Sequence, residues 1–239
     1  MNGHGGNEVV PVYVWDLVVR WTHWLIVLSM AVLSVTGIYI GNPFGVAGAE
    51  PGTSFLMGWM RVVHSYSAIV FTLAVLSRIL WMFIGPGMAR WRQFIPADRD
   101  RRRGFVGTLK FYLFMRPAPP PFVGHNPVAG AAYTLVFGLY LVMILTGFAL
   151  LSTSAGVGSP TGWFGFLVPL FGGTGLARWI HHVGMWLLIG FAIHHVYSGL
   201  LVSIVERNGT MDSIFSGWKW FPRHDLPATP AAKRGRHAA

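Results

Sequence analysis

The sequence predicts an all-α membrane protein, a four-transmembrane-helix bundle with both termini cytoplasmic. Three observations predict this class. Of the 239 residues, 53% are hydrophobic and only 11% are charged, whereas soluble domains carry about 25% charged residues. Four apolar stretches reach the length of about 20 residues that a helix needs to cross a bilayer. The positive charges gather in the segments between and after these stretches.

The four predicted spans are residues 21–40, 62–84, 128–151 and 179–205. Each is expected to be a helix, because a helix satisfies its own backbone hydrogen bonds in lipid. We take residues 1–226 as one transmembrane domain and expect the polar tail, 227–239, to be disordered. The apolar stretch 163–171 is too short to span, and we expect it at the outer membrane surface or against a partner.

The Lys and Arg residues set the orientation of the spans. Eight of them lie in 85–127 and six follow residue 205, whereas the other two connections contain only Arg61 and Arg178. Cytoplasmic loops carry an excess of Lys and Arg, so the middle loop and both termini are expected to face the cytoplasm. The net charge of +10 is therefore explained by membrane orientation, and binding of nucleic acid is a poor interpretation.

Histidines are the candidate ligands of a cofactor. The chain contains no cysteine, which excludes disulfides, cysteine-ligated iron–sulfur clusters and the covalent attachment of a c-type heme. Ionisable side chains inside a membrane are costly and mark functional sites. A hydrogen bond to a neighbouring helix would explain one such residue, but not six on three helices. The six are His23, His64, His181, His182, His194 and His195.

Helical spacing selects four of these histidines. At 100° and 1.5 Å per residue, His181 and His195 lie on one face of their helix and about 21 Å apart along its axis. The pairs 12 or 13 residues apart on that helix are about 120–140° out of alignment. From the predicted orientation, His64 shares the outer level with His181, and His23 shares the inner level with His195. Two such pairs at two depths are what two bis-histidine b-type hemes require.

Two further residues on the spans fit this interpretation. Arg78 follows His64 by 14 residues and so lies on the same face at the inner level. There it could pair with a heme propionate, or it could extend to the cytoplasmic interface. Gly37 follows His23 by 14 residues, and its missing side chain leaves room either for a heme ring or for ordinary helix packing.

Two other classes of protein place histidines in membranes. Zinc and copper sites bring their ligands close together, whereas the same-face pair is about 21 Å apart. No H-E-x-x-H zinc-protease motif is present. A proton-relay transporter usually needs carboxylates in its helices, and the only ones near the spans are Asp16 and Glu206, at their ends. A His-based metal or proton transporter is therefore the less favoured alternative.

Several stretches, spread over nearly the whole chain, resemble the b-type cytochrome subunit of membrane-bound nickel–iron hydrogenases. They are Val12-Tyr13-Val14-Trp15, Arg20-Trp21-Thr22-His23-Trp24, Val35-Thr36-Gly37, Phe55-Leu56-Met57-Gly58, Gly124-His125-Asn126-Pro127, Leu145-Thr146-Gly147-Phe148-Ala149, His181-His182-Val183-Gly184-Met185-Trp186 and His195-Val196-Tyr197. The resemblance implies heme iron ligation by the same four residues, His23, His64, His181 and His195. His194 departs from the family pattern. His182 matches it but lies off the heme face, where it could bond a propionate or a partner subunit.

The resemblance also implies a function. The subunit would hold two heme b groups and anchor the iron–sulfur small subunit and nickel–iron large subunit of a hydrogenase at the periplasmic face of the bacterial inner membrane. It would pass electrons to quinone, and the chemistry on hydrogen would take place on the partner subunits. A cytochrome subunit of another respiratory dehydrogenase, of the formate or thiosulfate type, is the main alternative.

A more distant likeness relates the loop before the third predicted span to quinone binding. The membrane subunit of respiratory formate dehydrogenase has an Asn beside its quinone at the cytoplasmic start of the third helix. Asn126, with His125, occupies a comparable place in this sequence. Asn and Pro are also ordinary helix-start residues, so Asn126 and Pro127 would equally explain a helix cap.

Overall fold

Four long apolar helices make up most of the protein. The structure is a computed structural model that describes residues 8–44, 51–95, 99–118, 120, 126–154, 156 and 158–223. The long helices are α1 (Leu17–Gly41), α2 (Pro51–Ile84), α4 (Pro127–Ser152) and α6 (Thr174–Glu206). All four are long and apolar enough to cross a membrane, which confirms the prediction of a four-span membrane protein. The predicted disordered tail, 227–239, lies outside the described residues.

All four helices begin before the predicted spans, because hydropathy marks the lipid-embedded part while local capping sets the ends. At α1, Asp16 Oδ1 accepts a hydrogen bond of 3.0 Å from the Val19 backbone N–H. This is an N-cap interaction, which satisfies a helix-start donor. At α6, the preceding Gly173 has a φ of 100°, a conformation that favours glycine.

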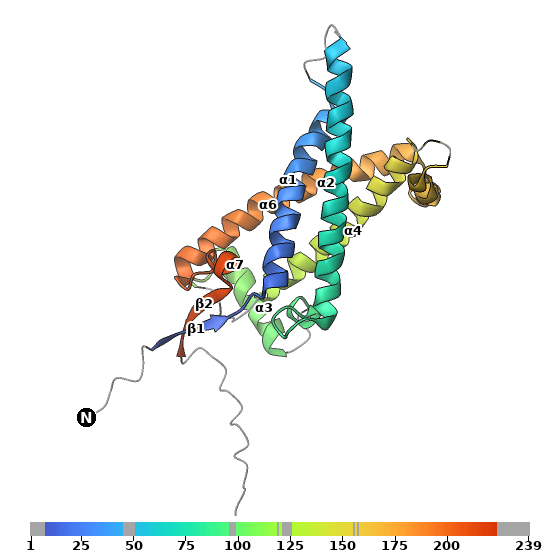
Figure 1. The fold of residues 1–239 in the computed structure, drawn as a ribbon. Helices are drawn as coiled ribbons and strands as arrows, with labels where there is room; N and C mark the ends of the chain where they lie inside the picture. The colour runs from blue at the N-terminus through green and yellow to red at the C-terminus, as the bar shows by residue number, and fades with distance from the viewer. Residues whose placement is uncertain are drawn as a thin grey trace, which may run out of the picture.

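The long helices form two pairs. α1 packs along α2, and α4 packs on α6 (Figure 1). The contacts of α2 with α4 and of α1 with α6 are less extensive. Where the pairs meet, Val75 is fully buried beside Phe71, Tyr140 and Leu188. The rings of Phe71 and Tyr140 meet edge to face with centroids 5.1 Å apart. This core joins the pairs near the middle of the bundle.

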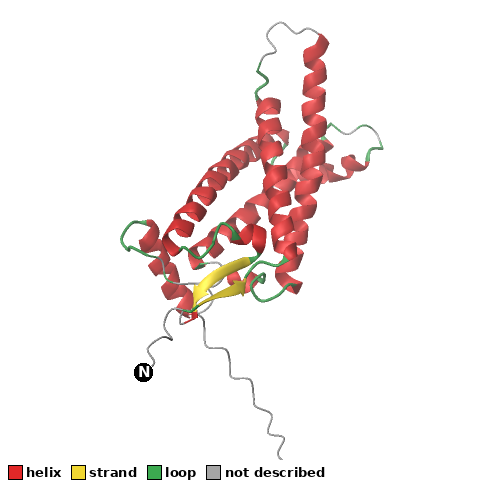
Figure 2. Ribbon diagram, turned by 60° about the vertical axis from the view of Figure 1, so that its left-hand side comes forward, coloured by secondary structure: helices red, strands yellow, loops and turns green. Residues whose placement is uncertain are grey.

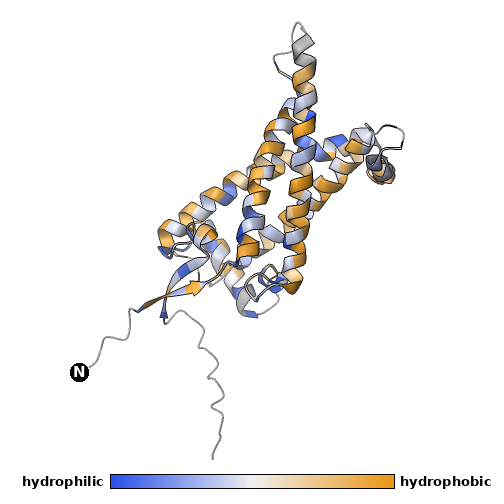
Figure 3. Ribbon diagram, in the orientation of Figure 1, coloured by the Kyte–Doolittle hydropathy of each residue, from blue (hydrophilic) through white to orange (hydrophobic). Residues whose placement is uncertain are grey.

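The outward faces of the long helices are apolar. In an apolar stretch of 18 residues in each long helix, only 11–28% is buried inside the protein. Apolar positions run along the outer ribbon surfaces (Figure 3). Leu28, Leu73, Leu135 and Ile193 are examples of large exposed side chains. A soluble monomer rarely exposes an apolar surface of this extent, whereas lipid tails cover it in a membrane.

One end of the bundle carries elements that the sequence did not predict (Figures 1 and 2). They are the strands β1 (Val9–Tyr13) and β2 (Trp218–Pro222), the helices α3 (Arg99–Tyr112) and α7 (Ser213–Ser216), and the 3₁₀ turn η1 (Trp91–Gln93). The strands pair antiparallel, with Val9 opposite Pro222 and Tyr13 opposite Trp218. The all-α prediction is therefore corrected to a mostly helical protein, because pairing of two distant segments leaves no local signal.

This end holds the start of α1 in place. The Trp15 indole N–H donates to Ser213 Oγ at 3.0 Å, and the Arg20 guanidinium donates to the Phe215 carbonyl. The ring of Trp24, one turn further along α1, lies 4.7 Å from the ring of Phe215. Contacts with α7 therefore fix the part of α1 that carries His23.

The opposite end contains η2 (Pro160–Phe166) and α5 (Leu167–Leu170), which pack on α4. The rings of Phe148 and Phe164 stack 4.5 Å apart, and Leu167 is buried. Trp163 is 83% exposed, so one side of this segment packs on α4 and the other side is exposed. Its predicted place at the outer membrane surface or against a partner stays a prediction.

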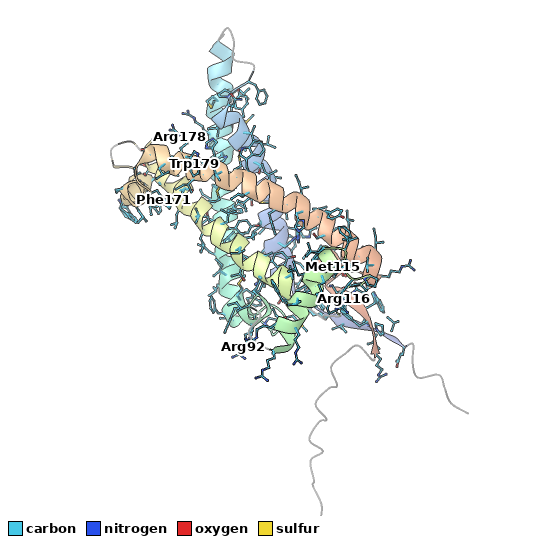
Figure 4. The ribbon with its side chains drawn as sticks, turned by 180° about the vertical axis from the view of Figure 1, so that it is seen from behind. Arg92, Met115, Arg116, Phe171, Arg178 and Trp179 are labelled. Carbon is cyan, nitrogen blue, oxygen red and sulfur yellow. The ribbon has the colours of Figure 1, made fainter. Side chains whose placement is uncertain are left out.

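The basic segments share one end of the bundle, as the predicted orientation requires. Figure 1 places α3 at the same end of the bundle as β1 and β2. Figure 4 shows the labelled Arg92, Met115 and Arg116 toward this end and Phe171, Arg178 and Trp179 toward the other. The side of the membrane on which each end lies stays a prediction.

Candidate functional site

Two histidine pairs bridge the helix pairs at two levels. His64 on α2 faces His181 on α6, with ring centroids 6.5 Å apart and planes inclined by 62°. His23 on α1 faces His195 on α6, with centroids 6.3 Å apart and planes inclined by 53°. The structure thus brings together the same two pairs that helical spacing and orientation predicted, and their role as ligands stays a prediction.

The spacing of the rings suits one metal ion between the two members of each pair. A metal ion lies about 2 Å from an imidazole nitrogen, so two rings on opposite sides of one ion have centroids roughly 6 Å apart. Among the described residues, no group of three or more His, Asp or Glu side chains gathers as a metal site. Two protein ligands per centre fit heme, in which the macrocycle supplies the other iron ligands.

Hydroxyl groups support the outer pair, His64 and His181. Thr36 Oγ1 on α1 lies 2.8 Å from His64 Nδ1, and Thr146 Oγ1 on α4 lies 2.9 Å from His181 Nδ1. Sequence reasoning missed both threonines. The available signal was that each is followed by a glycine in a stretch that carries the family resemblance.

Aromatic rings surround the inner pair, His23 and His195. Phe191 stacks on His195 with a centroid distance of 5.6 Å and an angle of 17°, and Tyr133 Oη lies 3.3 Å from His195 Nδ1. Trp24 meets His23 edge-on at 5.3 Å. The buried His23 Nδ1 has no hydrogen-bond partner among the described residues. The two centres therefore differ in what holds their imidazoles.

Arg78 lies inside the protein near the level of the inner pair. Its side chain is only 5% exposed, and its Nη1 donates to the Ala89 carbonyl at 3.3 Å. Its guanidinium lies 5.4 Å from the centroid of the Phe94 ring. Phe94 contacts Tyr133, which contacts His195. Arg78 thus does not extend to an exposed surface, and its pairing with a propionate stays a prediction.

The remaining two histidines of α6 belong to neither pair. His182 Nδ1 is 2.9 Å from the Arg178 carbonyl of its own helix. Its other ring edge lies against Gly41, where a Cβ would come within 2.5 Å of His182 Nε2. His194 is exposed, with Nε2 at 3.3 Å from Ser198 Oγ. Neither ring faces another imidazole in the described structure.

Asn126, predicted near quinone, caps α4. Its Oδ1 accepts a hydrogen bond of 2.8 Å from the Ala129 backbone N–H, and Pro127 occupies the first helical position. Its side chain also bonds the phenol of Tyr112 at the end of α3. Burial raises the pKa of Tyr112, and the Asn126 hydrogen bond opposes this rise. His125, its predicted companion, lies outside the described residues.

The fold and the site together define a class: a multi-pass membrane protein whose histidines pair across helices at two levels. The chain belongs to the family of prokaryotic cytochrome b561, whose profile matches residues 14–217.

Individual relatives agree with this over nearly the whole chain. The chain is 35% identical over 222 residues to a "Probable Ni/Fe-hydrogenase B-type cytochrome subunit" of Cupriavidus necator, with 90% of each chain covered. It is 36% identical over 221 residues to a "Probable Ni/Fe-hydrogenase 1 B-type cytochrome subunit" of Escherichia coli, covering 89% of this chain and 92% of the relative. These matches confirm the family that the sequence stretches predicted.

Proposed function

We propose that the protein is a diheme b-type cytochrome that anchors a hydrogenase to the cytoplasmic membrane and transfers electrons from its iron–sulfur small subunit to the quinone pool. The observation that carries the proposal is the presence of two histidine pairs, at two levels, between the α1–α2 pair and α6. The cytochrome family supports heme b as the occupant of each pair. The names of the relatives support the hydrogenase small and large subunits as partners.

In this proposal the chain holds and orients the hemes. His64 and His181 would bind the outer heme iron, and His23 and His195 the inner one. When bound, heme b supplies an iron that gains and loses one electron, while the protein sets its ligands and surroundings. The two ligands on α6 are 14 residues apart, which separates the centres by about 21 Å along the helix axis. Arg78, buried beside the inner level, would neutralise a propionate there.

The charge distribution predicts how the proposed electron path is oriented across the membrane. The basic end with α3 and β2 would face the cytoplasm by the positive-inside rule, which puts the pair His64 and His181 toward the periplasm. Hydrogenase subunits would dock at that outer face, beside η2 and α5. Electrons would then leave from the inner pair toward quinone near Asn126 and His125.

Heme content of the purified protein tests the heme part of the proposal. We expect b-type bands in the reduced-minus-oxidised spectrum and two hemes per chain by pyridine hemochrome quantitation. His64→Ala and His181→Ala should each remove one heme, and His23→Ala and His195→Ala should each remove the other. His194→Ala is the matched control and should keep both hemes. Absence of b-type bands from folded protein would refute the proposal, and so would loss of both hemes from a folded single variant.

The partner and quinone parts need the assembled complex. A tagged chain purified from its own membranes should bring down an iron–sulfur subunit and a nickel-containing subunit, and the nickel separates a hydrogenase from a formate or thiosulfate enzyme. Hydrogen-dependent quinone reduction should fall in Asn126→Asp, which keeps the capping oxygen but loses the amide, while heme content stays at two. An unchanged rate in this variant would remove Asn126 from the proposed quinone site.

A further inference from the structure

The outer histidine pair is flanked by the same dipeptide on both sides. Thr36–Gly37 lies on α1 and faces His64 of α2, and Thr146–Gly147 lies on α4 and faces His181 of α6. We call these two dipeptides the Thr–Gly steps. Neither α1 nor α4 supplies a ligand to the outer pair, so each imidazole is contacted by the helix that packs beside its own.

The threonine of each step contributes to which nitrogen of the imidazole carries the proton, together with a backbone carbonyl of its own helix that bonds the same ring, Leu33 for His64 and Met143 for His181. Thr36 Oγ1 donates to the Val32 carbonyl at 2.7 Å, and Thr146 Oγ1 donates to the Val142 carbonyl at 2.7 Å. A hydroxyl has one hydrogen to donate but two lone pairs. With that hydrogen engaged by the helix, the oxygen accepts a hydrogen bond from the imidazole Nδ1–H. The lone pair of the ring is then on Nε2, the nitrogen left for the iron.

The glycine of each step determines how closely the ring approaches the neighbouring helix. A Cβ at Gly37 would lie 3.4 Å from His64 Cε1, and a Cβ at Gly147 would lie 3.3 Å from His181 Cε1. An alanine at position 147 would therefore press on the ring, and an alanine at position 37 would already be in full contact with it. The same ring carbon is contacted in both steps, which makes the two arrangements alike.

We propose that the two Thr–Gly steps are positioning devices for the outer heme, and this rests on the proposed function that His64 and His181 bind its iron. Each threonine accepts a hydrogen bond that sets the rotation of one imidazole and, with the neighbouring backbone carbonyl, its tautomer. Each glycine sets the distance of the ring from the helix. A hydrogen bond from the free ring N–H raises the basicity of a metal-bound imidazole, which favours the oxidised iron. The steps therefore lower the reduction potential of the outer heme.

In the described structure, no Thr–Gly dipeptide contacts either histidine of the inner pair. His23 Nδ1 has no hydrogen-bond partner among the described residues. His195 Nδ1 faces the phenol of Tyr133 at 3.3 Å, a longer contact than the 2.8 Å and 2.9 Å of the threonines. The structure thus supports a difference between the two centres that arises from their neighbours, because all four proposed ligands are of the same residue type.

Removal of the hydroxyls tests the proposal in purified, heme-loaded protein. Thr36→Val and Thr146→Val keep the side-chain shape and should retain two hemes by pyridine hemochrome. The redox titration should show a higher midpoint potential for one heme only, and the low-spin EPR signal of that heme, which depends on the angle between the ligand planes, should change. Thr36→Ser should restore both properties. Ser29→Ala is the matched control, because among the described residues its buried hydroxyl bonds only carbonyls of its own helix.

The glycines give a second, independent measurement. Gly147→Ala should shift the EPR signal of the outer heme or reduce its occupancy, whereas Gly138→Ala on the same helix, where a Cβ meets nothing within 4 Å, should do neither. If the Thr variants keep both potentials and both EPR signals, the proposal is wrong. It is also wrong if they lose a heme that Ser does not restore. Absence of heme from the wild-type protein would instead overturn the proposed function.

Discussion

Replacement of Asp16 should destabilise the basic end of the bundle, because each of its two carboxylate oxygens accepts a separate hydrogen bond. Oδ1 accepts from the Val19 backbone N–H at 3.0 Å and caps α1. Oδ2 accepts from the Trp81 indole N–H at 3.0 Å and so ties the start of α1 to the end of α2. Asp16→Ala removes both contacts. It also leaves a partly buried indole donor without its partner.

The expected loss follows from these two contacts. Loss of an N-cap costs about 0.5–2 kcal/mol, and an unsatisfied donor costs about 1–3 kcal/mol. A combined loss of roughly 3 kcal/mol would lower the melting temperature of a chain of this size by about 6–12 °C. Asp16→Asn has one acceptor oxygen and can keep only one contact, so about half of that loss is expected. Trp81→Phe removes the donor itself and should cost only about 1 kcal/mol.

Thermal unfolding in detergent at a fixed scan rate provides the measurement. The variants Asp16→Ala and Trp81→Phe and their double form a thermodynamic cycle. The double variant should be less destabilised than the sum of the singles, because both singles break the same hydrogen bond. The Asp16 carboxylate also interacts electrostatically with Arg78. Loss of this interaction occurs in Asp16→Ala and in the double variant, so it cancels in the cycle. Full additivity, or a melting temperature of Asp16→Ala within about 1 °C of wild type, would refute the reasoning.

Three further predictions concern packing and charge. Gly130→Ala should cost about 1–3 kcal/mol in thermal unfolding, since its Cβ would come within 2.7 Å of backbone; an unchanged melting temperature would contradict this. Gly184→Ala should cost less than Gly130→Ala, because its Cβ meets the movable Met143 side chain. Burial lowers the pKa of Lys219, with Glu206 partly offsetting it. Between the lowered pKa of Lys219 and about 10.4, the value in the unfolded chain, the unfolded state binds more protons than the folded state. The free energy of unfolding should therefore rise with pH in this range. Thermal unfolding at several alkaline pH values should show this rise in the wild type and its loss in Lys219→Met.

Much of the candidate site could be predicted from the sequence, because the relevant signals are local. The number of spans follows from apolar stretches of sufficient length, and the alignment of His181 with His195 follows from the fixed geometry of a helix. The alternation of helix direction between spans then pairs His64 and His23 with them. These inferences need no knowledge of how the helices pack beyond their order across the membrane.

The tertiary structure decided what depends on contacts between segments distant in the sequence. The pairing of β1 with β2 has no local signal in the sequence. The two strands of five residues are far apart along the chain, and they pair because the bundle brings both segments to one end. The bonds of Thr36 to His64 and of Thr146 to His181 likewise join different helices. Sequence by itself determined the spans, their periodicity and the proposed ligand set. Only the packing of the helices decided which hydroxyls and glycines contact each imidazole, because side-chain hydrogen bonds depend on distances of a few tenths of an ångström that helical periodicity does not specify.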